Sequence, residues 1–302
     1  MVARMLVCMV FSPFLLGVIG KTKALFAGRK GPPYLQLYYD IFKLLQKGSV
    51  YSRTTTWIFR AAPLVSVTAV LVAAFLIPLG SLRAPIQFWG DVILFAYLFG
   101  LARFFMILAA LDTGSSFEGM GASREAAFSC LSEIALFLNF AVLAVLSKSF
   151  SLSGMIGACS WFSWTTMRPS LVLVDLSCFM ILLVENSRIP IDDPATHLEL
   201  TMIHEGMVLD HSGPDLAFIL YAGAIKFFVL GGFLITLLLP FHFYNPAMGT
   251  VVFLLGMVFL AAAVGVVESA MARLRLNRVS TFIIGSFVLA SFGLMIALAR
   301  AF

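Results

Sequence analysis

Eight long apolar segments constrain the fold of this chain more than any other feature of its sequence. Each can supply the roughly 20 helical residues that cross a bilayer. They cover residues 2–20, 57–79, 88–111, 126–146, 167–184, 216–239, 248–267 and 281–298. Only 12% of the 302 residues are charged, against about 25% in soluble proteins, which cannot bury so much apolar surface in one core. We therefore expect an all-α integral membrane protein, a single transmembrane domain over residues 1–302 with about eight spanning helices.

Basic residues in the connecting loops predict the orientation, because Lys and Arg accumulate on the cytoplasmic side of a membrane. The odd-numbered loops hold Lys21, Lys23, Arg29, Lys30, Lys43, Lys47, Arg53, Arg124, Arg188, Arg273, Arg275 and Arg278. The even-numbered loops and the two ends hold only Arg4, Arg83, Lys148 and Arg300. This asymmetry places both termini on the outer side.

The first loop, residues 21–56, contains an amphipathic segment at residues 34–47. Helical spacing places apolar side chains on one face: Tyr34, Leu37, Tyr38, Ile41, Leu44 and Leu45. The opposite face carries Gln36, Asp40, Lys43 and Lys47. We expect a cytoplasmic helix lying in the membrane interface. It serves either as a surface anchor or as a roof over a cavity that also docks a soluble partner.

The fifth loop, residues 188–215, is unusually acidic. It carries Asp192, Asp193, Glu199, Glu205, Asp210 and Asp215 against a single arginine. Asp193-Pro194 is typical of a helix start and Ser212-Gly213-Pro214 of a stop. Residues 194–211 are therefore predicted to form a helix, on which Glu199 and Asp210 share a face. The third loop, residues 112–124, is rich in Gly and Ser and is predicted to be a flexible turn.

Ionisable groups inside apolar segments are functional candidates, because lipid makes them costly. Glu133 has no charge partner within a turn or two on its own helix and is predicted to be a proton site. Asp175 and Lys226 are candidates for a structural pair between helices, and Glu185 for a pair with Arg188. Near the segment ends, Arg103 and Glu268 are expected to be interface anchors. The complete predicted proton path is Glu133, Glu185, Asp192, Asp193, Glu199, Glu205, Asp210, Asp112 and Glu118.

No motif for bond chemistry is present, and we predict no catalytic residue. The three histidines of the fifth loop, His197, His204 and His211, are seven residues apart, about 10 Å on a helix, too far to share one metal ion. We expect them to be solvated or to buffer protons. None of the four cysteines forms a C-x-x-C pair, so no metal or cluster is expected in this chain. The basic residues form no stripe for nucleic acid.

Five segments follow one another in a recognisable order. They are GRKGPPYLQLYYDIFKLL after the first apolar segment, FRAAP at the start of the second, LDTGSSFEGMGASREAAF after the third, ENSRIPIDDPATHLEL after the fifth and ESAMARLRL after the seventh. In them the chain resembles the membrane subunit of group 4 energy-converting [NiFe] hydrogenases, the formate hydrogenlyase and hydrogenase-4 type. That protein is related to the H subunit of respiratory complex I. The resemblance covers nearly the whole chain.

The resemblance implies a fold like that of the complex I H subunit and a non-catalytic subunit of an oxidoreductase complex in the prokaryotic cytoplasmic membrane. The partners it implies are the soluble [NiFe] hydrogenase large and small subunits, an iron–sulfur subunit and antiporter-like membrane subunits. These would hold the iron–sulfur clusters and the Ni–Fe centre, and this chain no cofactor. Partner docking or cavity roles are implied for Arg29, Asp40, Arg124 and Arg188, and acid roles for Glu133, Asp192, Glu199 and Asp210.

Two departures favour the hydrogenase over the alternative, the quinone-binding H subunit of a complex I-type NADH-quinone oxidoreductase. Lys21 and Lys23 stand where the complex I relatives have an acid, and the stretch between Glu199 and Asp210 is about three residues longer. A stand-alone secondary transporter is a further alternative, but we find no internal repeat of the kind that transporters show. The last alternative is a purely structural membrane anchor with no proton role. We expect a subunit that couples hydrogen chemistry to proton or sodium translocation.

Overall fold

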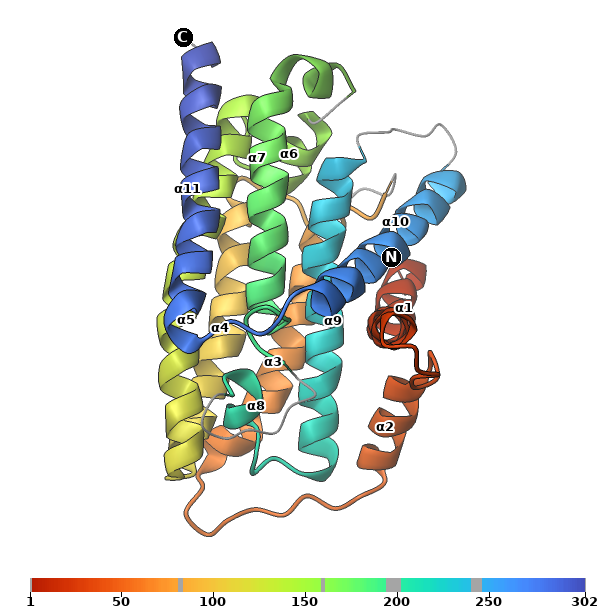
Figure 1. Ribbon diagram of the computed structural model, residues 1–302, viewed down its shortest axis with the longest axis vertical. Coiled ribbons are helices and arrows are strands. Elements are labelled where there is room, and N and C mark those ends of the chain that lie inside the picture. The colour runs from red at the N-terminus through yellow and green to blue at the C-terminus, as the bar shows by residue number, and fades with distance from the viewer. Residues whose placement is uncertain (1, 81–83, 159–160, 194–201, 240–245, 302) are drawn as a thin grey trace.

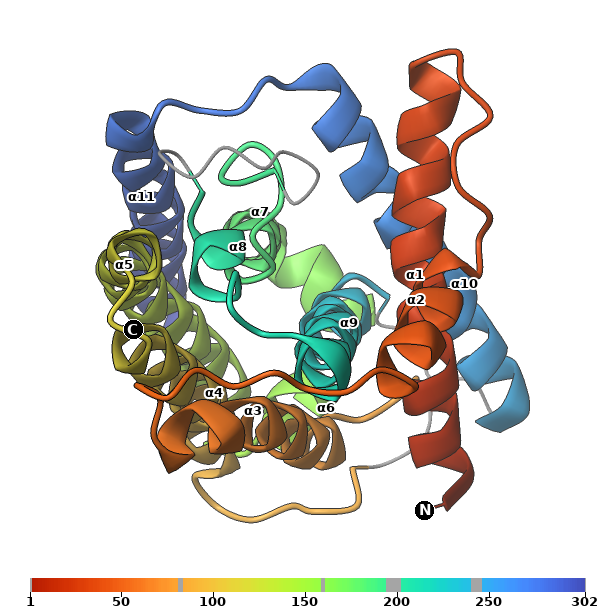
Figure 2. The ribbon, with the colours of Figure 1, turned by 90° about the horizontal axis from the view of Figure 1, so that it is seen from below.

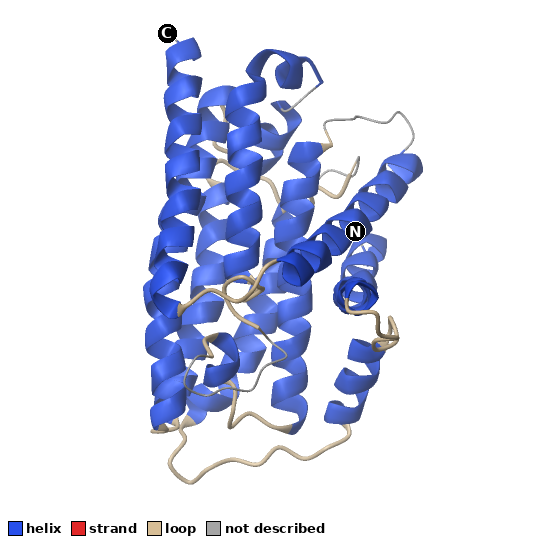
Figure 3. Ribbon diagram, in the orientation of Figure 1, coloured by secondary structure: helices blue, strands red, loops and turns tan. Residues whose placement is uncertain are grey.

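The computed structural model describes residues 2–80, 84–158, 161–193, 202–239 and 246–301, and the described part is helical without strands (Figure 3). In chain order, the helices are α1 (Val2–Phe26), α2 (Gln36–Leu45), α3 (Trp57–Leu76), α4 (Asp91–Asp112), α5 (Ser116–Ser147), α6 (Leu152–Ala158), α7 (Trp161–Glu185), α8 (His204–Met207), α9 (Gly213–Leu238), α10 (Pro246–Ala270) and α11 (Leu276–Ala301).

Seven helices of the described part are long and apolar enough to cross a membrane: α1, α3, α4, α5, α9, α10 and α11. The fifth predicted segment falls within α7, which has 25 residues. The expectation of an all-α membrane protein is therefore confirmed, and the chain is a multi-pass membrane protein.

Two orientations of helix build the molecule (Figure 1). Helices α3, α4, α5, α7, α9 and α11 stand upright, with α3 packed on α4 and α9, and α11 on α5 and α7. Helices α1 and α10 pack on each other and are strongly inclined to this bundle, as the view from below shows (Figure 2). Phe95, Phe140 and Phe233 form the aromatic centre of the bundle, with ring centroids 5.7–6.2 Å apart.

The amphipathic helix is present as α2. Its residues Leu37, Tyr38, Ile41 and Leu44 are half-buried, in agreement with packing on α1 and α9. Tyr38 also donates a hydrogen bond to the carbonyl oxygen of Val10 in α1. A second apolar set, Tyr39 and Phe42, is 60% and 66% exposed. The helix therefore has apolar side chains on both its protein side and its outer side.

Two predicted loops are wrong in part. Helix α5 begins at Ser116, so most of the predicted flexible turn at residues 112–124 is helical. Its first turn carries Glu118, and an acid there is favoured by the helix dipole. In the fifth loop, the described part of residues 194–211 contains only the four-residue α8, which ends in turns at Val208. Backbone N–H groups that a longer helix would use internally are instead bound by the Asp192 carboxylate, as described below.

Candidate functional site

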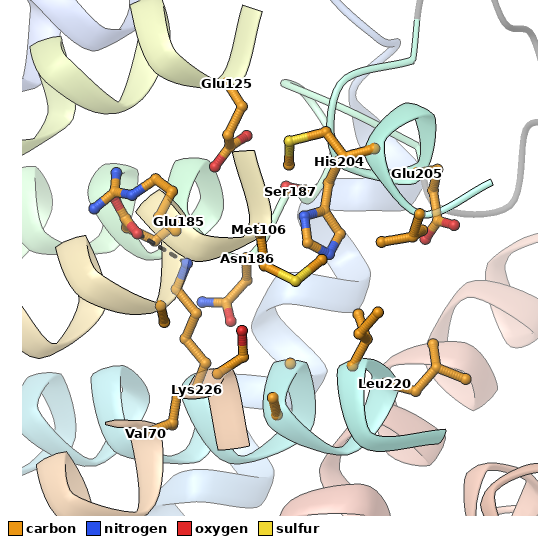
Figure 4. Close-up of a pocket in the computed structure, with 18 of the residues that line it drawn as sticks. Val70, Met106, Glu125, Glu185, Asn186, Ser187, His204, Glu205, Leu220 and Lys226 are labelled. Atoms are coloured by element: carbon orange, nitrogen blue, oxygen red, sulfur yellow. Dashed lines mark hydrogen bonds and ion pairs between the residues drawn. The ribbon is translucent and has the colours of Figure 1, made fainter. Parts of the chain in front are cut away.

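A cavity of about 180 Å³ lies between helices α3, α4, α7 and α9 and the α7–α8 loop. One part of its wall is apolar, with Val70, Met106, Val208, Ile219 and Leu220. The other part is polar and charged. It carries Arg103, Glu125, Glu185, Asn186, Arg188, Asp192, His204, Glu205 and Lys226 (Figure 4). The cavity therefore has one apolar wall and one charged wall.

A continuous ionic cluster forms one end of this cavity. Glu185 at the end of α7 pairs with Lys226 of α9 at 2.9 Å and with Arg103 of α4 at 3.1 Å. Its Oε1 also accepts a hydrogen bond from the Ser132 hydroxyl at 2.7 Å. Arg103 reaches onward to Glu133 of α5 at 2.9 Å. The Glu185 side chain is 5% and the Arg103 side chain 7% exposed, so the cluster is desolvated and its charges depend on one another.

The cluster corrects three expectations. Lys226 pairs with Glu185 and not with Asp175, which is buried with neither carboxyl oxygen hydrogen-bonded within the described residues. Arg103 is buried and is not an interface anchor. Glu185 does not pair with Arg188 either, because Arg188 turns to Glu268. For Glu185, pairing along one helix was the wrong guide, since its partners come from α4 and α9.

Asp192 organises the loop that closes the cavity. Its carboxylate is 1% exposed, pairs with Arg273 at 2.7 Å and accepts the backbone N–H groups of Ile203 and His204 at 3.0 and 3.2 Å. Such a carboxylate starts the short helix α8 from outside, in the place of an N-cap residue. Asp192 is therefore a positioning residue for α8.

Helix α5 holds the same loop from its other side. Arg124 donates a hydrogen bond to the Met202 carbonyl at 2.8 Å. A Cβ at Gly121 would lie 3.0 Å from the Ile203 carbonyl oxygen and 3.1 Å from the Met207 backbone nitrogen. Only glycine lets the two backbones approach this closely, so α5 and α8 are fixed against each other.

Glu268 joins the inclined helices to this loop. It lies near the end of α10, its side chain is fully buried, and it pairs with Lys23 of α1 at 3.0 Å and with Arg188 at 3.5 Å. Lys23 also approaches Asp193 at 3.9 Å. The expectation that Glu268 is an interface anchor is wrong, because α1 and the α7–α8 loop cover it.

The remaining predicted acids lie at the loop end of the molecule, apart from the cavity. Glu118 is buried and accepts the Asp210 backbone N–H at 2.9 Å, whereas the Asp210 side chain is exposed. Asp112 accepts the backbone N–H and the hydroxyl of Thr56 at 2.6 and 3.0 Å. Both acids thus tie loops to helix ends. Glu199 lies outside the described residues.

Two residues with implied docking roles lie on the first loop, away from the cavity. Arg29 is exposed. Asp40 accepts a hydrogen bond from the Gln36 side chain at 2.9 Å within α2. The first loop ends near His211, whose ring stacks on Phe59 with centroids 3.9 Å apart. Burial lowers the pKa of His211 from 6.5 to about 4, so its imidazole is neutral at physiological pH.

Sequence reasoning missed Glu125 and gave His204 no specific role. Glu125 follows Arg124 on α5, and His204 begins α8. The signal for Glu125 was its place eight residues, about two turns, before Glu133. Among the described side chains, no three His, Cys, Asp or Glu residues come close enough to hold a metal ion.

Comparisons with known proteins agree with this architecture. The family model described as NADH dehydrogenase matches residues 1–299. Formate hydrogenlyase subunit 4 of Escherichia coli is 31% identical over 90% of this chain and 89% of its own length. Hydrogenase-4 component C of the same organism is 33% identical over 79% of this chain and 74% of its own. The H subunit of the NADH-quinone oxidoreductase of Syntrophotalea carbinolica is 28% identical over 88% of this chain and 82% of its own.

A chain of the membrane-bound sulfane sulfur reductase, an archaeal respiratory membrane complex, shares the fold. Its TM-score is 0.82 at 20% identity, over 98% of this chain and 99% of that one. The family model covers nearly all 302 residues, and two relatives exceed 30% identity over most of their length. The chain therefore belongs to the NADH dehydrogenase family, alongside formate hydrogenlyase subunit 4 and hydrogenase-4 component C.

Proposed function

We propose that this chain is the membrane anchor and ion-coupling subunit of an energy-converting hydrogenase complex in the prokaryotic inner membrane, with both termini outside. It would link electron transfer and hydrogen chemistry in soluble [NiFe] and iron–sulfur partners to proton or sodium translocation. The sequence similarity to formate hydrogenlyase subunit 4 and hydrogenase-4 component C supports the kind of complex. The chain itself would be non-catalytic.

One observation carries the coupling role: four alternating charges run across the bundle from Glu133 through Arg103 and Glu185 to Lys226. Removing a proton or a cation at any member changes the balance at the next, because charges act strongly on one another at low dielectric. A change of charge in a partner subunit near the cavity can in this way alter the electrostatic environment of Glu133, although this chain itself transfers no electron.

Glu133 also faces outward, which favours a neighbouring membrane subunit. Its side chain is 37% exposed, and the nearby faces of α4 and α5 carry the exposed apolar residues Tyr97, Leu101 and Ile134. A carboxylate in this setting is costly in lipid. Coverage by an antiporter-like subunit would remove that cost and give the proton a path onward.

The test is Glu133→Gln in the complete complex, reconstituted in vesicles. Hydrogen evolution from a reduced low-potential donor and ion movement are measured together, with and without an uncoupler. We expect uncoupled hydrogen evolution to persist while ions moved per hydrogen fall at least about tenfold, since a proton-transfer group is lost. Cys130→Ser, one turn away on α5, is the matched control. An unchanged ion-to-hydrogen ratio would contradict the proposal.

The apolar wall of the cavity favours a second candidate, binding of a quinone. Met106, Val208 and Ile219 would suit an apolar ring. However, the cavity volume of about 180 Å³ is below the roughly 300 Å³ at which sites for ligands of this size begin. Quinone reduction by the purified complex, blocked by a bulky Ile219→Trp, would favour this candidate, and hydrogen activity without quinone reduction would favour the first.

A further inference from the structure

We propose that Glu125 and His204 form a proton-exchange pair that controls the charge beside the buried ionic cluster from the loop end of the cavity. The inference rests on the proposed coupling function and adds the entry group to it. Sequence reasoning assigned Glu125 no role, and it predicted His204 only to be solvated or to buffer protons together with the other loop histidines. Both side chains line the cavity (Figure 4).

The two side chains come from different elements and both point into the cavity. In Figure 4, the Glu125 carboxylate of α5 points towards Glu185, and the His204 imidazole of α8 lies between Ser187 and Met106. Within the described part of the chain, neither side chain makes a hydrogen bond or an ion pair. Neither side chain is therefore held by a partner among the described residues.

The ionic cluster cannot receive a proton as easily by itself. Glu185 is bound by Arg103, Lys226 and the Ser132 hydroxyl, so a proton must compete there with two cations. Glu125 has no such partners, but it lies close enough for its charge to act on Arg103. A change of charge on Glu125 therefore reaches the cluster through Arg103, without breaking an ion pair first.

The backbone of His204 is fixed although its imidazole is free. Asp192 accepts the backbone N–H groups of Ile203 and His204, and Arg124 holds the carbonyl of Met202. An imidazole is the side chain best suited to exchange protons near neutral pH, because one ring nitrogen can accept a proton while the other donates one. A fixed backbone with a free ring keeps this exchange at one place in the cavity.

The step is a proton transfer only. A proton from water binds one ring nitrogen of His204, and the proton on the other nitrogen passes, directly or through a water, to the carboxylate of Glu125. Neutral Glu125 no longer attracts Arg103, which then binds Glu185 and Glu133 more strongly. The charged groups that share the cavity and act on this pair are Arg103, Glu185, Arg188, Asp192, Glu205 and Lys226.

The experiment compares His204→Ala and Glu125→Gln with Asp215→Asn, an acid in the first turn of α9 that is not among the residues lining the cavity. The complete complex is assayed in vesicles for coupled ion movement across a pH series, with and without added imidazole. We expect His204→Ala to lower the coupled rate at least about tenfold, and added imidazole to restore it. Glu125→Gln should lower the rate without rescue, and Asp215→Asn should leave it unchanged.

Three outcomes overturn the inference. Coupled rates could stay normal in both variants, or the loss in His204→Ala could resist imidazole with an unshifted pH profile, which indicates a structural role. Equal losses in Asp215→Asn would also count against it. His204→Gln keeps the side-chain size and replaces the alanine variant if that one fails to assemble. The Glu133→Gln variant is assayed in parallel. If it loses coupling while the His204 and Glu125 variants couple normally, this inference alone is rejected. If Glu133→Gln couples normally, the proposed function is rejected.

Discussion

The pair of Glu185 and Lys226 offers the sharpest test of how the membrane interior is held together. At 2.9 Å, opposite charges attract by about 6 kcal/mol at an effective dielectric constant near 20. Desolvation offsets much of this attraction, so removing one partner of such a buried pair costs about 3–5 kcal/mol, mainly because the other charge is left alone. We expect Glu185→Gln and Lys226→Met each to destabilise the protein by that amount.

The double variant Glu185→Gln/Lys226→Met should cost much less than the sum of the two single variants. Arg103 then still pairs with Glu133, and no charge of the Glu185–Lys226 pair remains uncompensated. An interaction energy of about 0.5–3 kcal/mol is usual for residues in contact, and the upper end is expected for a pair with side chains 19% and 5% exposed.

The assay uses the protein's own thiols. Cys8 and Cys178 are buried and Cys130 is exposed, so a thiol-reactive dye reports unfolding in a Cys130→Ser, Cys159→Ser background. Each kcal/mol should move the melting temperature of a chain this long by about 2 °C. The single variants should therefore melt about 6–10 °C lower. Additive losses in the double variant would refute the reasoning, because they would mean that the two residues act independently.

Three further predictions concern the loop end. Between about pH 6.5 and 4, His211 binds a proton in the unfolded chain but not in the folded one. The contribution of His211 to the free energy of unfolding is therefore fully present above about pH 6.5, and about 3 kcal/mol of it is lost as the pH falls to about 4. Melting temperatures of His211→Phe measured across this range should lack that slope. Asp192→Asn should lower the hydrogen-exchange protection of the Ile203 and His204 amides at least about tenfold, since a bond to a charged group is worth about 1.5–3 kcal/mol; unchanged protection would exclude the capping role. Gly121→Ala should cost about 1–3 kcal/mol by overpacking α5 against α8, which thermal melting measures, with Gly119→Ala, where a Cβ meets nothing, as its control.

The sequence predicted the helices well because lipid imposes a simple rule on them. Any chain that crosses a bilayer must satisfy its backbone internally, so an apolar segment of sufficient length specifies a helix without reference to its neighbours. The boundaries were less certain. Helix α5 extends into a polar segment from Ser116, where hydropathy gives no signal and the start depends on helix-end chemistry.

Pairing between helices was beyond sequence reasoning. Asp175 and Lys226 were matched because both charges lie in apolar segments, but depth alone does not give the rotation of each helix. Helix α7 turns Glu185 towards α4 and α9, and this rotation depends on how all its neighbours pack. The short α8 was missed for a similar reason, since the carboxylate that starts it comes from Asp192, eleven positions before Ile203.

The inclination of α1 and α10 changes the membrane beside them. A helix of 25 residues is about 38 Å long, so it spans a hydrocarbon layer of about 30 Å only up to a tilt of about 40° from the membrane normal. Lying across the bundle, α1 and α10 present a shorter hydrophobic height, so the bilayer must thin along this edge. The voltage across the membrane then falls over a shorter distance on this side, and each charge that moves there works against a steeper electric field.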